Sequence, residues 1–265
     1  MADVYTHGHH DSVLRSHRWR TVANSAAYLV PRLRPGLDLL DVGCGPATLT
    51  ADLARLVAPG RVVGLDVAPA VLGEALAATG DQPNVEIVAG DVYRLPADSD
   101  SFDVVHAHQV LQHLTDPVAA LVEMKRVCRP DGVVAVRDAD YGAMTWWPEL
   151  PALTAWLELY RQVARTNRAE PDTGRRVAAW GAAAGFGEVE ASASVWCFAT
   201  PEERRWWGGL WSERMRESEL ARQAFDYGLA DRPLLDSIVA GWEEWARRED
   251  GWFAVLHGEI LCRPG

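Results

Sequence analysis

The chain of 265 residues carries 26 Lys and Arg against 37 Asp and Glu, a formal net charge of −11, and 48% of its residues are hydrophobic. This composition predicts one large globular domain, or one domain with a sizeable insertion. The negative charge disfavours nucleic acid and anionic membrane surfaces as partners.

The four cysteines are scattered without a CxxC pair, which argues against a zinc site or a disulfide framework. No apolar run approaches the ~20 residues that cross a bilayer, and residues 1–20 lack the apolar core of a signal peptide. A cytoplasmic protein is therefore expected.

From residue 37 to residue 140, short apolar strands alternate with helices. Strands are expected at 37–43, 61–66, 84–91, 102–109 and 133–140, and helices at 48–57, 68–79 and 116–128. Pro117 lies in the first turn of the third helix, where proline fits. This alternation predicts an α/β fold with a mostly parallel sheet, whose ligands bind outside the carboxyl ends of the strands.

Two regions flank this core. A helix over 17–33 is expected to cap it, and 11 of the 12 tryptophans lie beyond residue 141. Further strands are expected at 185–198 and 251–263, on either side of a helical insertion of about 200–249. The predicted architecture is a Rossmann-like, seven-stranded, mostly parallel sheet with helices on both faces, an N-terminal helical cap and a helical insertion before the last strand.

The first strand runs into a glycine-rich turn, LLDVGCGPA at residues 39–47. Gly43 and Gly45 remove side chains where the backbone must approach a ligand or adopt unusual dihedral angles. The helix that follows presents free backbone N–H groups at its N-terminus. A dinucleotide-binding fold would read GxGxxG here, whereas this turn reads G-C-G-P-A. The turn therefore predicts a nucleotide-like ligand other than a dinucleotide.

Three aspartates lie at or near the carboxyl ends of three of the predicted strands. Asp41 would be poorly placed beside a pyrophosphate but would suit a ligand that carries an amine or a positive charge. Asp66 lies about twenty residues after the glycines, where a carboxylate can accept hydrogen bonds from both ribose hydroxyls. Asp91 can accept from an exocyclic amine such as adenine N6. Three carboxylates around one cleft favour a cationic adenosyl ligand over a diphosphate.

Residues 36–140 resemble the class I S-adenosylmethionine-dependent methyltransferases, in particular the small-molecule enzymes of ubiquinone and menaquinone biosynthesis. Four motifs carry the resemblance in order: LLDVGCGPATLTADLA, VVGLDVAPAVL, AGDVYRLPADSDSFDVVHAHQVLQHLTDP and LVEMKRVCRPDGVVAV. The resemblance implies S-adenosylmethionine as the cofactor, S-adenosylhomocysteine as the product, and methyl transfer to a small-molecule acceptor. The cofactor-binding residues that it implies are Tyr5, Asp41, Gly43, Cys44, Gly45, Asp66, Val67, Asp91, Val92, His108 and Gln109. Ala47 departs from the family's frequent glycine, and we expect this small residue to be tolerated about one turn into the helix.

The acceptor side is predicted less directly. Residues 1–35 would form a lid over a cofactor-binding core at 36–141, and residues 142–265 would complete the sheet with Trp-rich insertions, all in one compact domain. His113 and His10 are candidate general bases for a hydroxyl acceptor. The HGHH segment at 7–10 could bind a metal, but no carboxylate–histidine framework supports this and no metal is predicted. Trp146, Trp147 and Trp207 are expected to line an apolar or aromatic acceptor pocket.

Several alternatives remain open at this level. The acceptor atom is undetermined between O, N, S and C, although HAHQVL at 106–111 lacks the NPPY-type signature of DNA amino-methylating enzymes. One rival function is an NAD-dependent oxidoreductase on the same general fold. Another is a non-catalytic module that binds S-adenosylmethionine without turnover. The Trp-rich insertion could equally form a homodimer interface.

Overall fold

A computed structural model describes residues 3–8 and 10–265, and residues 1, 2 and 9 lie outside the described part. The strands are β1 (Leu39–Val42), β2 (Val62–Asp66), β3 (Val85–Ala89), β4 (Phe102–His108), β5 (Cys128–Ala139), β6 (Thr145–Trp147), β7 (Glu188–Phe198) and β8 (Trp252–Arg263). The helices are α1 (Asp11–Arg18), α2 (Val22–Ser25), α3 (Thr48–Val57), α4 (Pro69–Thr79), α5 (Pro117–Val127), α6 (Pro151–Thr166), α7 (Val177–Ala183), α8 (Pro201–Glu217), α9 (Glu219–Asp226) and α10 (Arg232–Arg247). Short 3-10 turns occur at Val30–Arg32, Leu111–His113 and Tyr141–Ala143.

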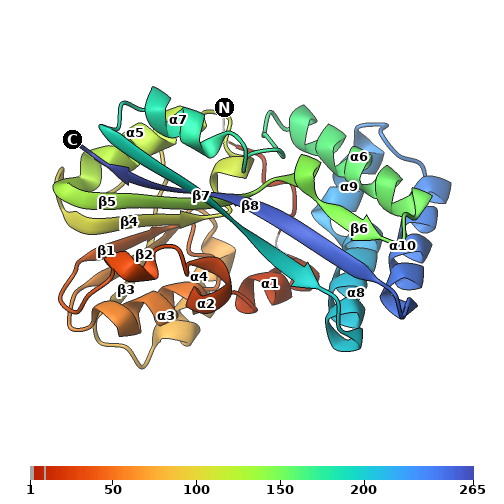
Figure 1. Ribbon diagram of the computed structural model, residues 1–265, viewed down its shortest axis with the longest axis horizontal. Helices are drawn as coiled ribbons and strands as arrows, with labels where there is room; N and C mark the ends of the chain where they lie inside the picture. The colour runs from red at the N-terminus through yellow and green to blue at the C-terminus, as the bar shows by residue number, and fades with distance from the viewer. Residues whose placement is uncertain (1–2, 9) are drawn as a thin grey trace.

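The sheet has the order β3-β2-β1-β4-β5-β8-β6, and β7 pairs with β8 as well. Strands β1 to β5 are parallel to one another, whereas β8 is antiparallel to β5, β6 and β7 (Figure 1). The mostly parallel α/β sheet is therefore as predicted, with one strand more than the seven expected. The extra strand is β6, which pairs with 252–254 of β8, while 257–262 of β8 pair with β5. The first residues of β8, which extend beyond the end of β5, therefore still have backbone hydrogen-bond partners, in β6.

The single helix expected over 17–33 is wrong. Helix α1 ends at Arg18, and Thr21 begins α2 through a capping box. The Thr21 side chain accepts from the Asn24 N–H, and the Asn24 side chain accepts from the Thr21 N–H. These local hydrogen bonds restart the helix, because a capping side chain satisfies N–H groups that a continuous helix would use internally.

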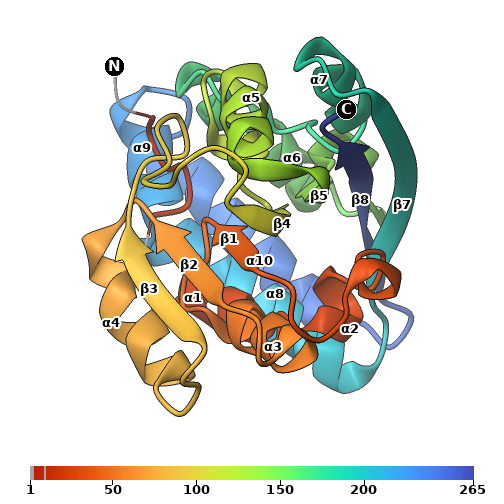
Figure 2. The ribbon, with the colours of Figure 1, turned by 90° about the vertical axis from the view of Figure 1, so that its left-hand side faces the viewer.

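Helices cover both faces of the parallel half of the sheet, and a helical group lies at its far end. Helices α3 and α4 lie on one face, while α5 and α7 lie on the other (Figures 1 and 2). Helices α6, α8, α9 and α10 gather around β6 and the distal parts of β7 and β8 (Figure 1). Helix α1 contacts both α3 and α8, so the N-terminal segment bridges the two regions.

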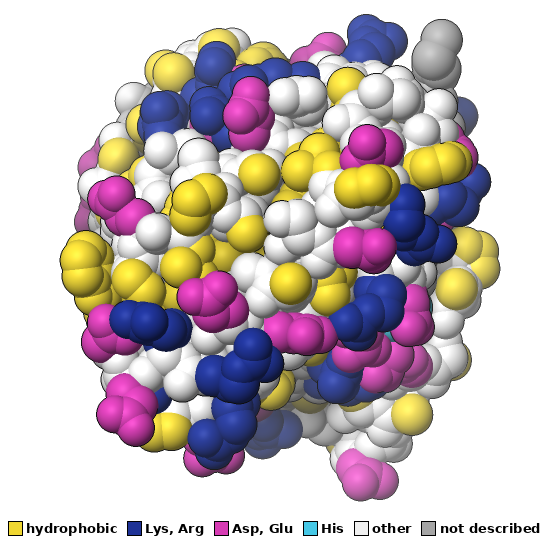
Figure 3. Space-filling model, turned by 90° about the vertical axis from the view of Figure 1, so that its right-hand side faces the viewer, with side chains coloured by type: hydrophobic (Ala, Val, Ile, Leu, Met, Phe, Trp, Pro, Cys, Tyr) yellow, Lys and Arg dark blue, Asp and Glu magenta, His cyan; other side chains and the backbone are white. Residues whose placement is uncertain are grey.

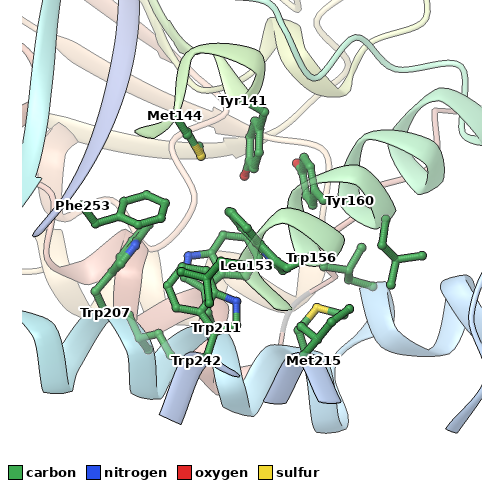
Figure 4. Packing of buried hydrophobic residues seen from close by; sticks show 14 of the residues in the cluster. Tyr141, Met144, Leu153, Trp156, Tyr160, Trp207, Trp211, Met215, Trp242 and Phe253 are labelled. Atoms are coloured by element: carbon green, nitrogen blue, oxygen red, sulfur yellow. The ribbon is translucent and has the colours of Figure 1, made fainter. Parts of the chain in front are cut away.

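An aromatic core holds this helical group together (Figure 4). The Trp156 ring lies 4.5 Å from that of Trp211 and 4.8 Å from that of Trp242, each in an edge-to-face arrangement. Trp146 stacks on Phe253 with centroids 5.7 Å apart. Buried aromatic pairs of this kind contribute area burial together with about 0.5–1.5 kcal/mol of specific interaction each. Most tryptophans of the insertion therefore account for its folding.

The outer surface of this helical group mixes charges of both signs. Lys and Arg side chains are interspersed with Asp and Glu and with scattered hydrophobic side chains on this face (Figure 3). In the described part of the chain, no helix is both long enough and apolar enough to span a membrane.

Candidate functional site

A cavity of about 310 Å³ opens at the carboxyl ends of β1, β2 and β4. It is lined by twelve of the residues singled out from the sequence: Tyr5, Asp41, Gly43, Cys44, Gly45, Asp66, Val67, Asp91, Val92, His108, Gln109 and His113. Parallel strands bring their carboxyl ends to one edge of the sheet, so residues far apart in the sequence meet there. The structure thus places every predicted cofactor-binding residue around one cavity.

The glycine turn has two left-handed positions, and one of them leaves no space for a side chain. Gly43 has φ +69°, and a Cβ built on it would lie 2.5 Å from Cγ2 of Val110. The N–H groups of Gly43 and Cys44 donate to the carbonyl of Leu65 at 2.7 and 3.0 Å. Gly45 also has a left-handed φ, of +54°. Backbone conformation therefore favours glycine at both positions, and close packing excludes a side chain at Gly43.

Ala47 is not one turn into the helix, as was expected, but is the residue that caps α3. Its φ and ψ are 58° and 20°, in the left-handed region, and its side chain is completely buried. Glycine adopts this conformation without a steric cost, which explains the family's preference. Alanine is tolerated because its methyl group packs in the core and offsets part of that cost.

We expect Ala47→Gly to change the free energy of unfolding by less than about 1 kcal/mol. Relief of the left-handed conformation, about 1–2 kcal/mol, opposes the loss of one buried methyl group, about 0.8 kcal/mol, and the greater freedom of glycine when unfolded. Ala47→Val should destabilise clearly, because a β-branched residue is a strained exception at positive φ. Urea denaturation of the three proteins checks both values, and equal stability of Ala47→Val and wild type would contradict this account.

The Asp41 carboxylate links β1 to two neighbouring elements, α3 and β4, through hydrogen bonds. Its carboxylate is 3% exposed and accepts from Thr50 Oγ1 at 2.5 Å. Its other oxygen lies 2.7 Å from His106 Nδ1. Asp41 was expected to face a ligand amine; it lines the cavity, but both of its oxygens have protein partners that join β1 to α3 and β4.

Asp66 is held by two backbone donors and keeps lone pairs that face the cavity. One oxygen accepts from the Gly45 N–H at 2.9 Å and the other from the Ala68 N–H at 2.9 Å. A carboxylate has about four acceptor positions, so a diol can still bind. Asp91, at the exposed rim, accepts from the Tyr93 N–H at 2.9 Å. Val67, 72% exposed, also lines the cavity, and an apolar side chain this exposed at a cavity rim is suited to contact a flat apolar group.

Two buried side chains in the cavity wall are uncharged. Burial raises the pKa of the Cys44 thiol well above its usual range, so no reactive thiolate forms at neutral pH. Burial, reinforced by Arg20, holds the pKa of His108 well below its usual range. Neither ring nitrogen of His108 has a partner among the described residues. A neutral imidazole with free nitrogens can accept from or donate to a ligand.

Arg20 is a functional candidate that the sequence did not reveal. It lines the cavity, and its Nη2 donates to Gln109 Oε1 at 2.7 Å. Its Nε has no partner, and among residues 3–8 and 10–265 no carboxylate forms an ion pair with it. Burial lowers its pKa to about 10, so it remains a cation at neutral pH. The Thr48 hydroxyl anchors its segment by donating to the His17 carbonyl at 3.2 Å.

Gln109 adopts an unusual backbone conformation between Arg20 and His257. Its φ is +55°, which is uncommon for a residue other than glycine and is often found at functional sites. Its amide nitrogen lies 2.9 Å from His257 Nε2. The side chain of Gln109 therefore orients the Arg20 guanidinium from the sheet side.

The two candidate bases have different surroundings. His113 lines the cavity, with its ring edge-to-face to that of Tyr5 at 4.7 Å. Burial, assisted by Arg20, lowers the pKa of His113 to about 3. His10 instead caps α1, where its Nδ1 accepts from the Ser12 N–H. His10 lies outside the lining of the described cavity.

The three tryptophans predicted to line the acceptor pocket lie in different parts of the structure. Trp147 is 56% exposed and pairs across the sheet edge with Trp252. Trp146 packs in the aromatic core, and neither of the two lines a described cavity. Trp207 lines a second cavity of about 30 Å³, which shares Tyr5, His17, Arg20, Gln109 and His113 with the first. Trp207 is thus the one of the three that lies next to the site.

Within the HGHH segment, His9 lies outside the described residues. His7 is buried, and its Nε2 lies 3.2 Å from the Tyr141 hydroxyl and 3.1 Å from the Tyr160 hydroxyl. Over the described ranges, no group of three or more His, Cys, Asp or Glu side chains is arranged to hold a metal ion.

Comparison with known proteins finds methyltransferase relatives and a solved methyltransferase of similar fold. The methyltransferase domain family matches residues 40–136. An uncharacterized methyltransferase of Schizosaccharomyces pombe is 31% identical over 98% of this chain and 96% of its own length. A demethylmenaquinone methyltransferase of Staphylococcus carnosus is 34% identical over 49% of this chain and 52% of its own. Among solved structures, a Haemonchus contortus phosphoethanolamine N-methyltransferase in complex with phosphomonomethylethanolamine and S-adenosylhomocysteine has a TM-score of 0.60 at 17% identity, covering 97% of this chain and 58% of that one.

Proposed function

The chain belongs to the class I S-adenosylmethionine-dependent methyltransferases, and on that premise we propose that it methylates a small, largely apolar or aromatic molecule bound where the smaller cavity joins the cofactor cavity. S-adenosylmethionine is the cofactor, and its sulfonium supplies the methyl group. The observation that carries the proposal is the junction of the two cavities. Tyr5, Arg20 and His113 line both, so an acceptor in the small cavity would lie next to the methyl donor.

The lining of the large cavity suits each part of the cofactor. The Asp66 carboxylate would accept hydrogen bonds from the ribose hydroxyls, and Asp91 from the adenine amine. Val67 and Val92 would contact the two faces of the adenine. The Gly43–Gly45 turn would lie against the methionine part, and Arg20 would pair with its carboxylate, since Arg20 is the cavity's cation without a carboxylate partner among the described residues.

In the transfer itself, the acceptor's lone pair forms the new bond to the methyl carbon while the carbon–sulfur bond breaks and sulfur keeps its electron pair. The protein's part is to align the acceptor and to exclude water. Trp207, Trp211 and Met144 supply apolar walls in the small cavity. For a hydroxyl acceptor, the neutral His113 ring would accept the departing proton at Nδ1. This requires that Nε2, which lies 3.0 Å from the Gln112 side-chain amide, carries the ring hydrogen and donates it to the amide oxygen, turned toward it.

Isothermal titration with S-adenosylhomocysteine and with NADH separates the proposal from an oxidoreductase. We expect binding of the first and none of the second. A screen of acceptors with methyl-labelled cofactor, including demethylmenaquinone, then tests turnover. Tight cofactor binding without turnover of any acceptor would favour the non-catalytic module.

The pH dependence of kcat tests the role of His113. With its pKa near 3, the ring is deprotonated from pH 5.5 to pH 8, and protonation disables it only below that range. We therefore expect no fall of kcat near pH 6.5 from this residue. For a hydroxyl acceptor, His113→Asn should lower kcat by about 100-fold and leave the Kd of S-adenosylhomocysteine within about threefold. An acidic limb near pH 6.5 that disappears in His113→Asn would contradict the neutral-base assignment.

A further inference from the structure

The small cavity is rich in hydrogen-bond donors and carries no acidic side chain in its described lining. Its polar lining residues are Tyr5, His7, Ser16, His17, Arg20, Gln109, Gln112, His113, Tyr141, Trp207, Trp211 and Arg214. The indole N–H groups of Trp207 and Trp211 and the Nε of Arg214 have no hydrogen-bond partner among the described residues. Buried donors are normally paired. Unpaired indole N–H groups also occur on Trp146, Trp156 and Trp242, away from this cavity, but Trp207, Trp211 and Arg214 line it, where a bound acceptor could satisfy them.

Arg214 is the strongest of these donors. It projects from α8 and is 4% exposed. Its Nη2 donates to the Ser12 carbonyl at 3.0 Å and to Ser16 Oγ at 2.6 Å. No carboxylate of the described ranges pairs with it, whereas Arg216 on the same helix pairs with Glu243 at 2.7 Å. A buried guanidinium without a carboxylate counter-charge is unfavourable. Arg214 Cζ lies over the Trp211 ring, 4.8 Å from its centroid, and this cation–π contact offsets only part of that cost.

The rest of the cavity does not supply the missing negative charge. The ring of Tyr141 stacks on that of Tyr160 at 3.8 Å (Figure 4), and burial raises the pKa of Tyr141 to about 12. Burial and Arg214 hold the pKa of His7 well below its usual range. Both groups are therefore neutral at pH 7. Asp138 is buried behind Gln112, whose N–H it accepts, and it does not line the cavity.

Two guanidinium groups thus face the joined cavities, and the cofactor offers one carboxylate. Arg20 lines both cavities, whereas Arg214 lines only the small one. We propose that the methyl acceptor is an organic anion whose carboxylate binds Arg214 and the indole N–H groups of Trp207 and Trp211. This assignment rests on the proposed methyltransferase function and specifies its substrate class. A planar carboxylate matches the fork of a guanidinium, and a volume of about 30 Å³ suits a group of this size.

The test uses matched acids and amides against the protein saturated with S-adenosylhomocysteine. Isothermal titration compares benzoate with benzamide and phenylacetate with phenylacetamide. We expect at least one acid to bind about 10-fold or more tightly than its amide. Arg214→Met should abolish that preference and leave the Kd of S-adenosylhomocysteine within about threefold. Arg216→Met, the exposed control on the same helix, should retain the preference.

Arg214 also ties α1 to α8, so a structural contribution must be separated from binding. Ser16→Ala removes one partner of Arg214 but leaves the guanidinium, and it should keep the preference for acids. Arg214→Lys keeps the charge without the fork, serves if Arg214→Met does not fold, and should weaken the preference without abolishing it.

Several outcomes would overturn the assignment. They are amides binding as tightly as acids, no acid binding to the wild type at millimolar concentration, or an acid preference that persists in Arg214→Met. Tighter binding of phenyl phosphate than of either acid would replace the carboxylate by a phosphate. Failure of the wild type to bind S-adenosylhomocysteine would instead count against the cofactor site.

Discussion

Replacing Asp66 by alanine should weaken the binding of S-adenosylhomocysteine about 100-fold. The side chain would lose two charge-assisted hydrogen bonds to the ribose, each contributing about 1.5 kcal/mol or more, and 1.4 kcal/mol corresponds to a tenfold change in Kd. It would also release the Gly45 N–H, which Asp66 Oδ2 accepts at 2.9 Å. Isothermal titration gives the Kd directly.

Asp66→Asn separates the two contributions. The amide oxygen still accepts, but the amide nitrogen cannot, so we expect an intermediate loss of about 10-fold. Asp81→Ala, at an exposed position after α4, controls for the loss of one negative charge and should leave the Kd unchanged. An affinity of Asp66→Ala within threefold of the wild type would show that Asp66 only shapes the turn.

Most of the cofactor cavity was predictable because its residues follow the strands of successive βα units. Asp41, Asp66 and Asp91 are each tied by chain connectivity to the carboxyl end of a strand or the turn after it, and parallel pairing brings those ends together. The position of each aspartate relative to its own strand was therefore enough to predict that the three lie close together in the fold. Ala47 shows the limit of this reasoning. The sequence motif aligns the position with the family's glycine, but it does not show whether that position lies inside α3 or caps it.

The acceptor side was not predictable in the same way. Arg214 meets Ser16 across 198 residues of sequence, and no spacing rule links a helix of the insertion to the N-terminal segment. Trp147 follows β5 closely and was expected at the pocket, yet the pairing of β6 with β8 carries it to the sheet edge. The HRWR run at 17–20 was visible in the sequence, but nothing in it distinguished Arg20 from a solvated arginine.

Replacing Glu259 by methionine should lower the free energy of unfolding by about 3–5 kcal/mol, because it leaves the Arg137 charge buried without its partner. Arg137 is 1% exposed, and its Nε donates to Glu259 Oε1 at 3.1 Å. The two residues face each other in the β5–β8 register. Burial already lowers the pKa of Arg137 to about 10 despite this partner, so loss of the carboxylate removes the main compensation for that burial. Urea denaturation measures the effect.

A double variant tests whether the cost comes from the orphaned charge. Arg137→Met with Glu259→Met removes both ions, and we expect it to be more stable than Glu259→Met alone, since apolar pairs can replace buried ion pairs at little cost. Glu243→Met breaks the exposed Arg216 pair and should cost less than about 1 kcal/mol. Failure of the double variant to recover stability would show that the ion pair itself, and not the unpaired charge, determines the local structure.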